Sequence, residues 1–117
     1  MEIIRYDAGP RMSRVVEYNG VLYFGGHVSH PKFKGIREQT EALTQRLDEL
    51  FEEYGTDKDH MLSAMIHMKD ISMIQEMNVV WEEWINDGNA PSRTCVEVEL
   101  AEDYILLEIT VVAAKKQ

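Results

Sequence analysis

The stretch VVEYNGVLYF, residues 15–24, is the clearest local signal in this 117-residue sequence. Two runs rich in β-branched and aromatic residues flank Asn19-Gly20, a pair that tolerates the positive φ angles of a two-residue type I′ turn. The second run ends in Gly25-Gly26, which would weaken a strand unless a backbone or a ligand must come close. The stretch therefore predicts a β-hairpin whose second strand ends at a point of close approach.

Two helices and three more strands are predicted after the hairpin. An apolar stripe at helical spacing runs between about residues 35 and 54 and stops at Gly55; it consists of Leu43, Leu47, Leu50, Phe51 and Tyr54. Ser72 and Gln75 form a capping-box pattern that opens a second helix, which carries Met77, Trp81 and Trp84 inward and ends near Gly88.

The remaining segments alternate in the manner of strands. Residues 61–70, MLSAMIHMKD, predict a strand with one apolar side, formed by Leu62, Ala64, Ile66 and Met68. Two strands, at about 93–100 and 104–114, finish the chain. The order strand, strand, helix, strand, helix, strand, strand predicts one α+β domain over residues 1–117, a sandwich with both helices on one face of a mixed sheet.

Several of these segments, VLYF, AMIHM and ILLEITVVAA, are apolar on both sides. A sheet built from them needs cover on both faces, and the two helices cover only one. We therefore expect another subunit on the second face.

Composition narrows the function classes. Twelve Lys and Arg against 21 Asp and Glu give a net charge of −9, which repels phosphate backbones, whereas nucleic-acid binders show a basic surface. No stretch approaches the roughly 18–20 apolar residues of a membrane span. The single cysteine cannot form an internal disulfide. We expect a cytoplasmic protein that binds neither nucleic acid nor membrane.

The segment SRTCVEVEL, residues 92–100, places Arg93 and Cys95 on one side of a predicted strand. Two interpretations of Arg93 are open: an ion pair with Glu97 or Glu108, or bidentate binding of a substrate carboxylate. Cys95 is either a small buried hydrophobe or a nucleophile. Glu108 interrupts an apolar strand and is either a general base or the partner that holds Arg93.

Two histidines, His27 and His30, lie three apart. They lack a third ligand at a recognisable spacing, so we expect no metal site.

Seven motifs together resemble the RidA (YjgF/YER057c/UK114) family of reactive-intermediate deaminases. They are AGP at 8–10, YNGVLYFGGHV at 18–28, EQT at 38–40, MKD at 68–70, MNVVWEEW at 77–84, APSRTCVEVEL at 90–100 and LLEITVVAA at 106–114. The most specific is Pro-x-Arg-x-Cys-Val-Glu, followed by a glutamate fifteen residues after the arginine.

The resemblance implies a chorismate-mutase-like fold and a homotrimer, with the sheets forming a central barrel, the helices outside and clefts between subunits. In these clefts Arg93 would bind the carboxylate of a small 2-imino or enamino acid such as 2-aminoacrylate. Glu108 would orient the water that replaces ammonia and leaves a 2-keto acid. Cys95 would line the cleft, and the backbone at Gly25-Gly26 would approach the ligand. No metal or organic cofactor is implied.

On that view Arg93 and Cys95 face the cleft, while Val96 and Val98 pack the core of the monomer.

The sequence also departs from the family pattern. Arg11 stands where deaminating members usually carry an aromatic residue, Gly25 where a serine is usual, and His27 where a glutamine is common. Arg11 is either a surface charge or a second cation suited to a larger or doubly anionic ligand. A non-catalytic trimer that binds small carboxylates is therefore an alternative function. Ribonuclease and translation-inhibitor activities, also described in the family, are disfavoured by the negative charge.

Overall fold

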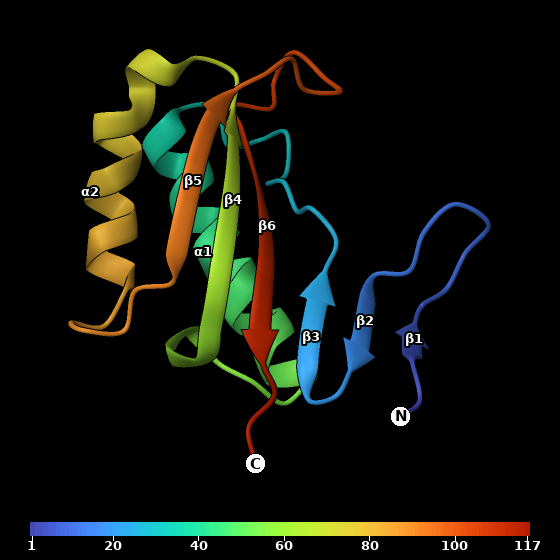
Figure 1. Ribbon diagram of the computed structural model, residues 1–117. Helices are drawn as coiled ribbons and strands as arrows, with labels where there is room; N and C mark the ends of the chain where they lie inside the picture. Colours follow the sequence, from blue (N-terminus) through green and yellow to red (C-terminus); the bar gives the residue numbers. More distant parts are fainter.

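The predicted hairpin forms the centre of one half of the sheet. In the computed structural model, which describes residues 1–117 (Figure 1), strands β2 (Val15–Tyr18) and β3 (Val21–Phe24) pair antiparallel. Asn19 and Gly20 between them have φ angles of 52° and 76°. Both central residues are thus left-handed, as the type I′ turn requires, which confirms the prediction from the Asn-Gly pair.

Six strands form one mixed sheet in the order β1-β2-β3-β6-β4-β5. The other strands are β1 (Ile4–Tyr6), β4 (Met61–Met68), β5 (Ser92–Glu97) and β6 (Leu107–Ala114). Only the β4–β5 pair is parallel, and β5 forms one edge of the sheet. The predicted order of elements is correct, except that the three-residue β1 was not expected. The last two strands are not neighbours, because β4 lies between them.

Helices α1 (Ile36–Glu53) and α2 (Ile74–Trp84) lie on the same face of the sheet, with α2 nearest the edge strand β5 (Figure 1). This confirms the predicted α+β arrangement. The α1 stripe is buried as its spacing predicted, and Phe51 of this helix packs edge-on against Phe24 of β3 at 5.3 Å between ring centroids. Gly55 ends the helix region with a φ of 82°, where a residue with a Cβ would be strained.

The buried side chain of Gln39, within the motif EQT, fixes the loop that precedes β6. Its amide nitrogen donates to the carbonyls of Phe33 and Tyr104, and its amide oxygen accepts from the backbone N–H of Leu106. Burying an amide is favourable only when its donors and acceptor are satisfied in this way. Gln39 thereby fixes Leu106, the residue just before β6, two residues before Glu108.

Two local details differ from the sequence prediction. Leu62 is 49% exposed and Met61 is buried in its place, because the register of β4 shifts between Met61 and Ser63. The predicted capping box at Ser72 is absent: α2 has no side-chain cap, and Asp70 instead caps the short 3₁₀ helix Ile71–Met73 that precedes it by accepting from the N–H of Ser72.

The second helix and the last two strands are also shorter than predicted. Helix α2 stops at Trp84, four residues before Gly88; β5 stops at Glu97, and β6 starts only at Leu107.

No helix covers the second face of the sheet, which we call the open face. Leu62, Tyr23, Met65 and Val96 are between 37% and 49% exposed there. An apolar surface spread over several strands is unusual for a monomer. No helix in the chain is long and apolar enough to cross a bilayer.

Candidate functional site

Arg93 and Cys95 point toward the helices. In the parallel pair, Arg93 is in register with Ala64 and Cys95 with Ile66, and both β4 residues are buried on the helix side. Residues in register share a face of the sheet, so Val96 lies on the open face. The expectation that Val96 and Val98 pack the monomer core is therefore wrong for Val96, which is 37% exposed, and β5 ends before Val98 is reached.

The guanidinium of Arg93 lies over the indole ring of Trp81, with Cζ 5.6 Å from the ring centroid. The two side chains form part of an open groove of about 560 Å³ between α2 and the loop that leads into β5. We call this the Arg93 groove; its lining includes Asn78, Trp81, Ile85, Pro91 and Arg93. A guanidinium held over an aromatic face keeps its N–H edges available to an anion.

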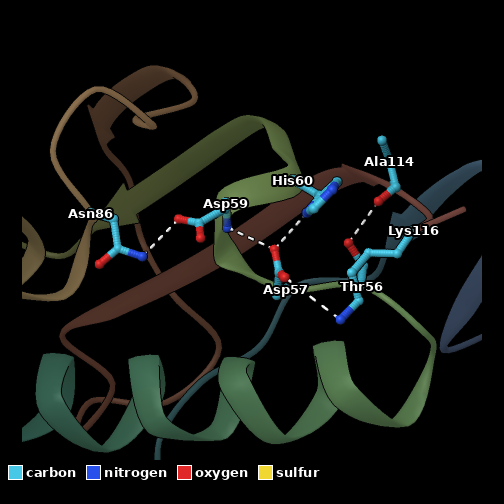
Figure 2. Close-up of polar contacts among 7 residues, drawn as sticks. All are labelled: Thr56, Asp57, Asp59, His60, Asn86, Ala114 and Lys116. Atoms are coloured by element: carbon cyan, nitrogen blue, oxygen red, sulfur yellow. Dashed lines mark hydrogen bonds and ion pairs between the residues drawn. The ribbon is translucent and has the colours of Figure 1, made fainter.

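One wall of the Arg93 groove is held by the segment that leads into β4. Asn86, in the loop after α2, donates from Nδ2 to Oδ1 of Asp59 at 2.8 Å (Figure 2). Asp59 belongs to a short 3₁₀ helix, Lys58–His60, whose cap Asp57 accepts from the N–H of Asp59 and contacts Nδ1 of His60 at 2.6 Å. This polar cluster holds the groove loop against the connection between α1 and β4.

Arg93 has no ion-pair partner, so the interpretation as an internal ion pair is wrong. Glu97 Oε1 instead accepts from the backbone N–H of Ile71 at 2.9 Å, at the approach to α2. Glu108 lies on the opposite face of the sheet from Arg93, because β4 and β6 place it in register with His67. The guanidinium is therefore a cation without a counterion in the chain.

Cys95 is half-buried and packs against the hydrophobic core. Burial raises the pKa of its thiol, and the nearby Arg93 offsets this only in part. A thiol that stays protonated near neutral pH is a poor nucleophile, so the structure favours the small-hydrophobe interpretation of Cys95.

Glu108 stands on the open face between Gly26 and His67, and these three residues form what we call the Glu108 cluster. A Cβ built on Gly26 would lie 2.7 Å from Cδ of Glu108 and 2.8 Å from its Oε2. On the other side, Nδ1 of His67 is 3.6 Å from Oε1. The close approach predicted at Gly25-Gly26 is thus made, within the chain, by the Glu108 carboxyl group at Gly26.

The strand segment after β3 is held beside β6 by His27. Its backbone exchanges two hydrogen bonds with Ile109, each 3.0 Å long, and its Nδ1 donates to the carbonyl of Gly25 at 2.8 Å. Burial lowers the pKa of His27, so the neutral ring makes this bond. His27 therefore fixes the backbone of the glycine pair against the strand that carries Glu108. No group of three or more His, Cys, Asp or Glu side chains is placed to hold a metal ion.

Arg11 is exposed, in the loop between β1 and β2. The backbone N–H of Gly25 donates to the carbonyl of Arg14 at 2.9 Å, and Cε of Met12 would lie 3.2 Å from a Cβ at Gly25. The loop that carries Arg11 therefore lies beside the glycine pair, on the Glu108 side of the site.

The predicted site residues thus form two separate groups. Arg93 and Cys95 belong to the helix side of the edge strand, whereas Gly25, Gly26 and Glu108 belong to the other half of the sheet, with β4 between β5 and β6. The sequence predicted His67 as a packed or interface side chain and did not assign it to the site. Its alternation with buried Ile66 and Met68 marks it as a polar side chain of the open face, but only the register shows that it meets Glu108.

The chain is similar to known proteins over nearly its whole length. The family model described as endoribonuclease L-PSP matches residues 4–115. A RutC family protein of Haemophilus ducreyi is 35% identical over 112 residues, 96% of each chain. The RutC family protein YoaB of Escherichia coli is 35% identical over 97% of this chain and 99% of its own. A crystal structure from Neisseria meningitidis, of a member of the YjgF protein family, has a TM-score of 0.93 at 35% identity and covers 100% of this chain and 98% of the other.

Proposed function

The chain belongs to the RidA/YjgF family, and from this premise we propose that it hydrolyses small reactive 2-imino or enamino acids to 2-keto acids and ammonia. The family membership confirms the resemblance found in the sequence motifs. The substrate class, the reaction and the roles of the residues are inferences from that membership and from the geometry of the Arg93 groove and the Glu108 cluster.

The unpaired guanidinium of Arg93 is the observation that carries the proposal. A 2-imino acid presents a carboxylate, and a bidentate pair with arginine supplies both charge and orientation. Arg93 borders an open groove and lies against Trp81, so binding a carboxylate there would give the cation its missing partner. The side chain of Cys95 follows Arg93 on the same face of the strand and would line the site.

Glu108 supplies the second half of the reaction. As the oxygen of a bound water forms a bond to the imine carbon, its proton passes to the Glu108 carboxylate and the π electrons of C=N move to nitrogen. Glu108 returns this proton to the nitrogen, and as the C–N bond breaks and C=O forms, the hydroxyl proton also passes to the nitrogen, which leaves as ammonia. An imine is already electrophilic, so orientation and a base suffice and no metal or organic cofactor is required.

Two protomers are needed to bring these halves together. Arg93 and Glu108 lie on opposite faces of one sheet, so one chain cannot offer both to one small ligand. A homotrimer with the open faces of its sheets turned inward would bury the exposed apolar side chains and place the Arg93 groove of one protomer against the Glu108 cluster of the next. The open face and its apolar residues support this assembly.

Arg11 bears on which substrate is preferred. It lies in the loop beside Gly25 and adds a second cation to the Glu108 side, which suits a larger or doubly anionic imino acid.

Endoribonuclease activity, which the name of the family model suggests, is not proposed, because the net charge of −9 opposes attraction of a polyanion. The proposed setting is the cytoplasm, where a lone unpaired cysteine is ordinary.

The decisive experiment follows ammonia and keto-acid release from 2-iminobutanoate or 2-aminoacrylate generated in situ. The wild-type protein should release ammonia faster than buffer alone does, and the Arg93→Ala variant should not. Arg93→Lys keeps the positive charge but loses the paired N–H donors of the guanidinium. This variant should bind a small keto acid at least about tenfold more weakly than wild type. If the wild type binds keto acids without accelerating hydrolysis, the non-catalytic carboxylate binder is the correct function. If Arg93→Lys binds the keto acid as tightly as wild type, bidentate binding by the guanidinium does not determine carboxylate recognition.

A further inference from the structure

His67 contains the one imidazole nitrogen of the chain that is buried without a hydrogen-bond partner. Nδ1 has no partner in the chain, although the side chain as a whole is 28% exposed. A buried polar atom left unpaired costs free energy, so each case calls for an explanation. A carboxylate oxygen, Oε1 of Glu108, lies 3.6 Å from this nitrogen.

The surroundings of His67 offer no other partner. On β6 it faces Glu108, and on β5 it faces Val96, so the carboxylate is the only polar group directly in register with it. The gap of 3.6 Å is longer than a hydrogen bond, so the pair forms only when one of the two side chains moves closer. Catalytic hydrogen bonds are often long without ligand and shorten when the substrate complex forms.

We propose that His67 is the positioning residue for Glu108; this inference rests on the proposed function. In the ligand complex Nδ1–H donates to Oε1, which holds the carboxylate in one orientation against the backbone of Gly26. The missing side chain of Gly26 leaves the space that the Glu108 carboxyl group occupies. His67 constrains the carboxylate from the other side, and a hydrogen bond to a charged acceptor is among the stronger ones in proteins.

His67 keeps its proton throughout the reaction. The proton that leaves the attacking water goes to Glu108 and from there to the departing nitrogen, so no proton is gained or lost at the imidazole. The contribution of His67 is to stabilise the anionic carboxylate and its orientation while that transfer occurs. This role affects the chemical step and leaves carboxylate recognition at Arg93 unchanged.

Two substitutions separate the proposed role from simple packing. His67→Phe keeps a planar ring and removes the donor, whereas His67→Asn keeps a side-chain N–H close to the position of Nδ1. For 2-iminobutanoate, His67→Phe should lower kcat about tenfold or more with KM within about twofold, and His67→Asn should recover most of the loss. A His67→Phe enzyme with wild-type kcat, or equal losses in both variants, would overturn the proposal.

A second measurement does not depend on activity. Nitrogen-15 NMR of the wild-type assembly with a small keto acid bound distinguishes a proton on Nδ1 of His67 from one on Nε2. The proposal requires Nδ1–H in the wild type and a reduced population of that tautomer in Glu108→Leu. A tautomer that is unaffected by Glu108→Leu would refute the pairing. If the wild type releases no more ammonia than buffer, the proposed function fails, and the tautomer still shows whether His67 and Glu108 form a pair.

Discussion

The carboxyl group of Glu108 occupies the space in which a side chain at Gly26 would begin. A Cβ at this position would lie 2.7 Å from Cδ of Glu108, closer than such contacts occur in proteins. Gly26 has no positive φ, so its backbone conformation does not demand glycine. The requirement comes from a residue on β6, more than eighty positions later in the chain.

Replacement of Gly26 by alanine should therefore act through Glu108. The added methyl group must displace the carboxylate or the β3–β6 pairing, at a cost of about 1–3 kcal/mol in folding free energy. Hydrolysis of the imino acid should fall strongly, since the base loses its position. Thermal unfolding and kcat measured on the same preparation test this.

Gly35→Ala is the matched control for Gly26→Ala. A Cβ at Gly35 would meet only Oε1 of Glu38, at an ordinary 3.5 Å, and its φ of −93° suits alanine. This variant should keep its unfolding temperature and activity. Equal behaviour of the two alanine variants would show that the contact with Glu108 is unimportant.

Subunit mixing tests whether Arg93 and Glu108 act across an interface. Chains carrying Arg93→Ala and chains carrying Glu108→Gln should each be inactive. Assembled together at equal amounts, they should regain about a quarter of wild-type activity, because about one site in four then receives Arg93 and Glu108 from intact neighbours. Steady-state ammonia release from co-refolded mixtures measures the recovery.

A mixture of wild-type chains with the Arg93→Ala, Glu108→Gln double variant supplies the comparison. Sites shared between protomers predict about a quarter of full activity here too, whereas sites within one chain predict about half. No recovery in the first mixture, together with half activity in the second, would place both residues of each site in the same chain.

The Asp57 cluster predicts an acid-dependent term in stability. The hydrogen bond with His60 is the main cause that lowers the pKa of Asp57 below its usual value of 3.8, and Lys116, 3.7 Å away, acts in the same direction (Figure 2). A carboxylate with a depressed pKa stabilises the fold above its unfolded pKa, and the contribution is lost as the pH falls through the folded value. Since both side chains are about two-fifths exposed, the effect should not exceed about 1 kcal/mol.

Asp57→Asn should accordingly lower the free energy of unfolding at pH 7 by more than it does at pH 3. Urea unfolding at both pH values gives the two differences. Glu52→Gln, which removes one charge from an exposed position of α1, is the control for net charge alone. A difference between Asp57→Asn and wild type that stays constant with pH would mean that the ionised carboxylate contributes nothing specific.

Cys95 should react slowly with iodoacetamide. Because burial raises the pKa of the thiol above its usual 9.0, little thiolate is present at neutral pH, and only the thiolate is alkylated. We expect a rate at pH 7.5 below that of free cysteine and a rate that still increases above pH 9. Alkylation faster than free cysteine would instead indicate an activated thiol and reopen the nucleophile interpretation.

Local patterns were enough to predict most elements of the fold. Asn19-Gly20 specified the hairpin because few other pairs accept two positive φ angles, and the stripe from Leu43 to Phe51 specified α1 because its spacing fits only a helix. The prediction was wrong where a contact with a residue elsewhere in the chain, and not the local sequence, determined the structure. The register shift at Met61–Ser63 reversed the expected orientation of Leu62. Asp70 caps the 3₁₀ helix before α2, whereas Ser72 had been expected to cap the helix itself.

The sequence by itself determined which residues share a side of each strand: Arg93 goes with Cys95, and Glu108 alternates with Leu107 and Ile109. Only the tertiary structure decided which side that was and which strands are neighbours. A period of two leaves the direction of a face undefined until helices pack on it, and strand order depends on pairing between distant segments. For this reason the separation of Arg93 from Glu108, and the meeting of Glu108 with Gly26 and His67, became apparent only once β6 was placed between β3 and β4.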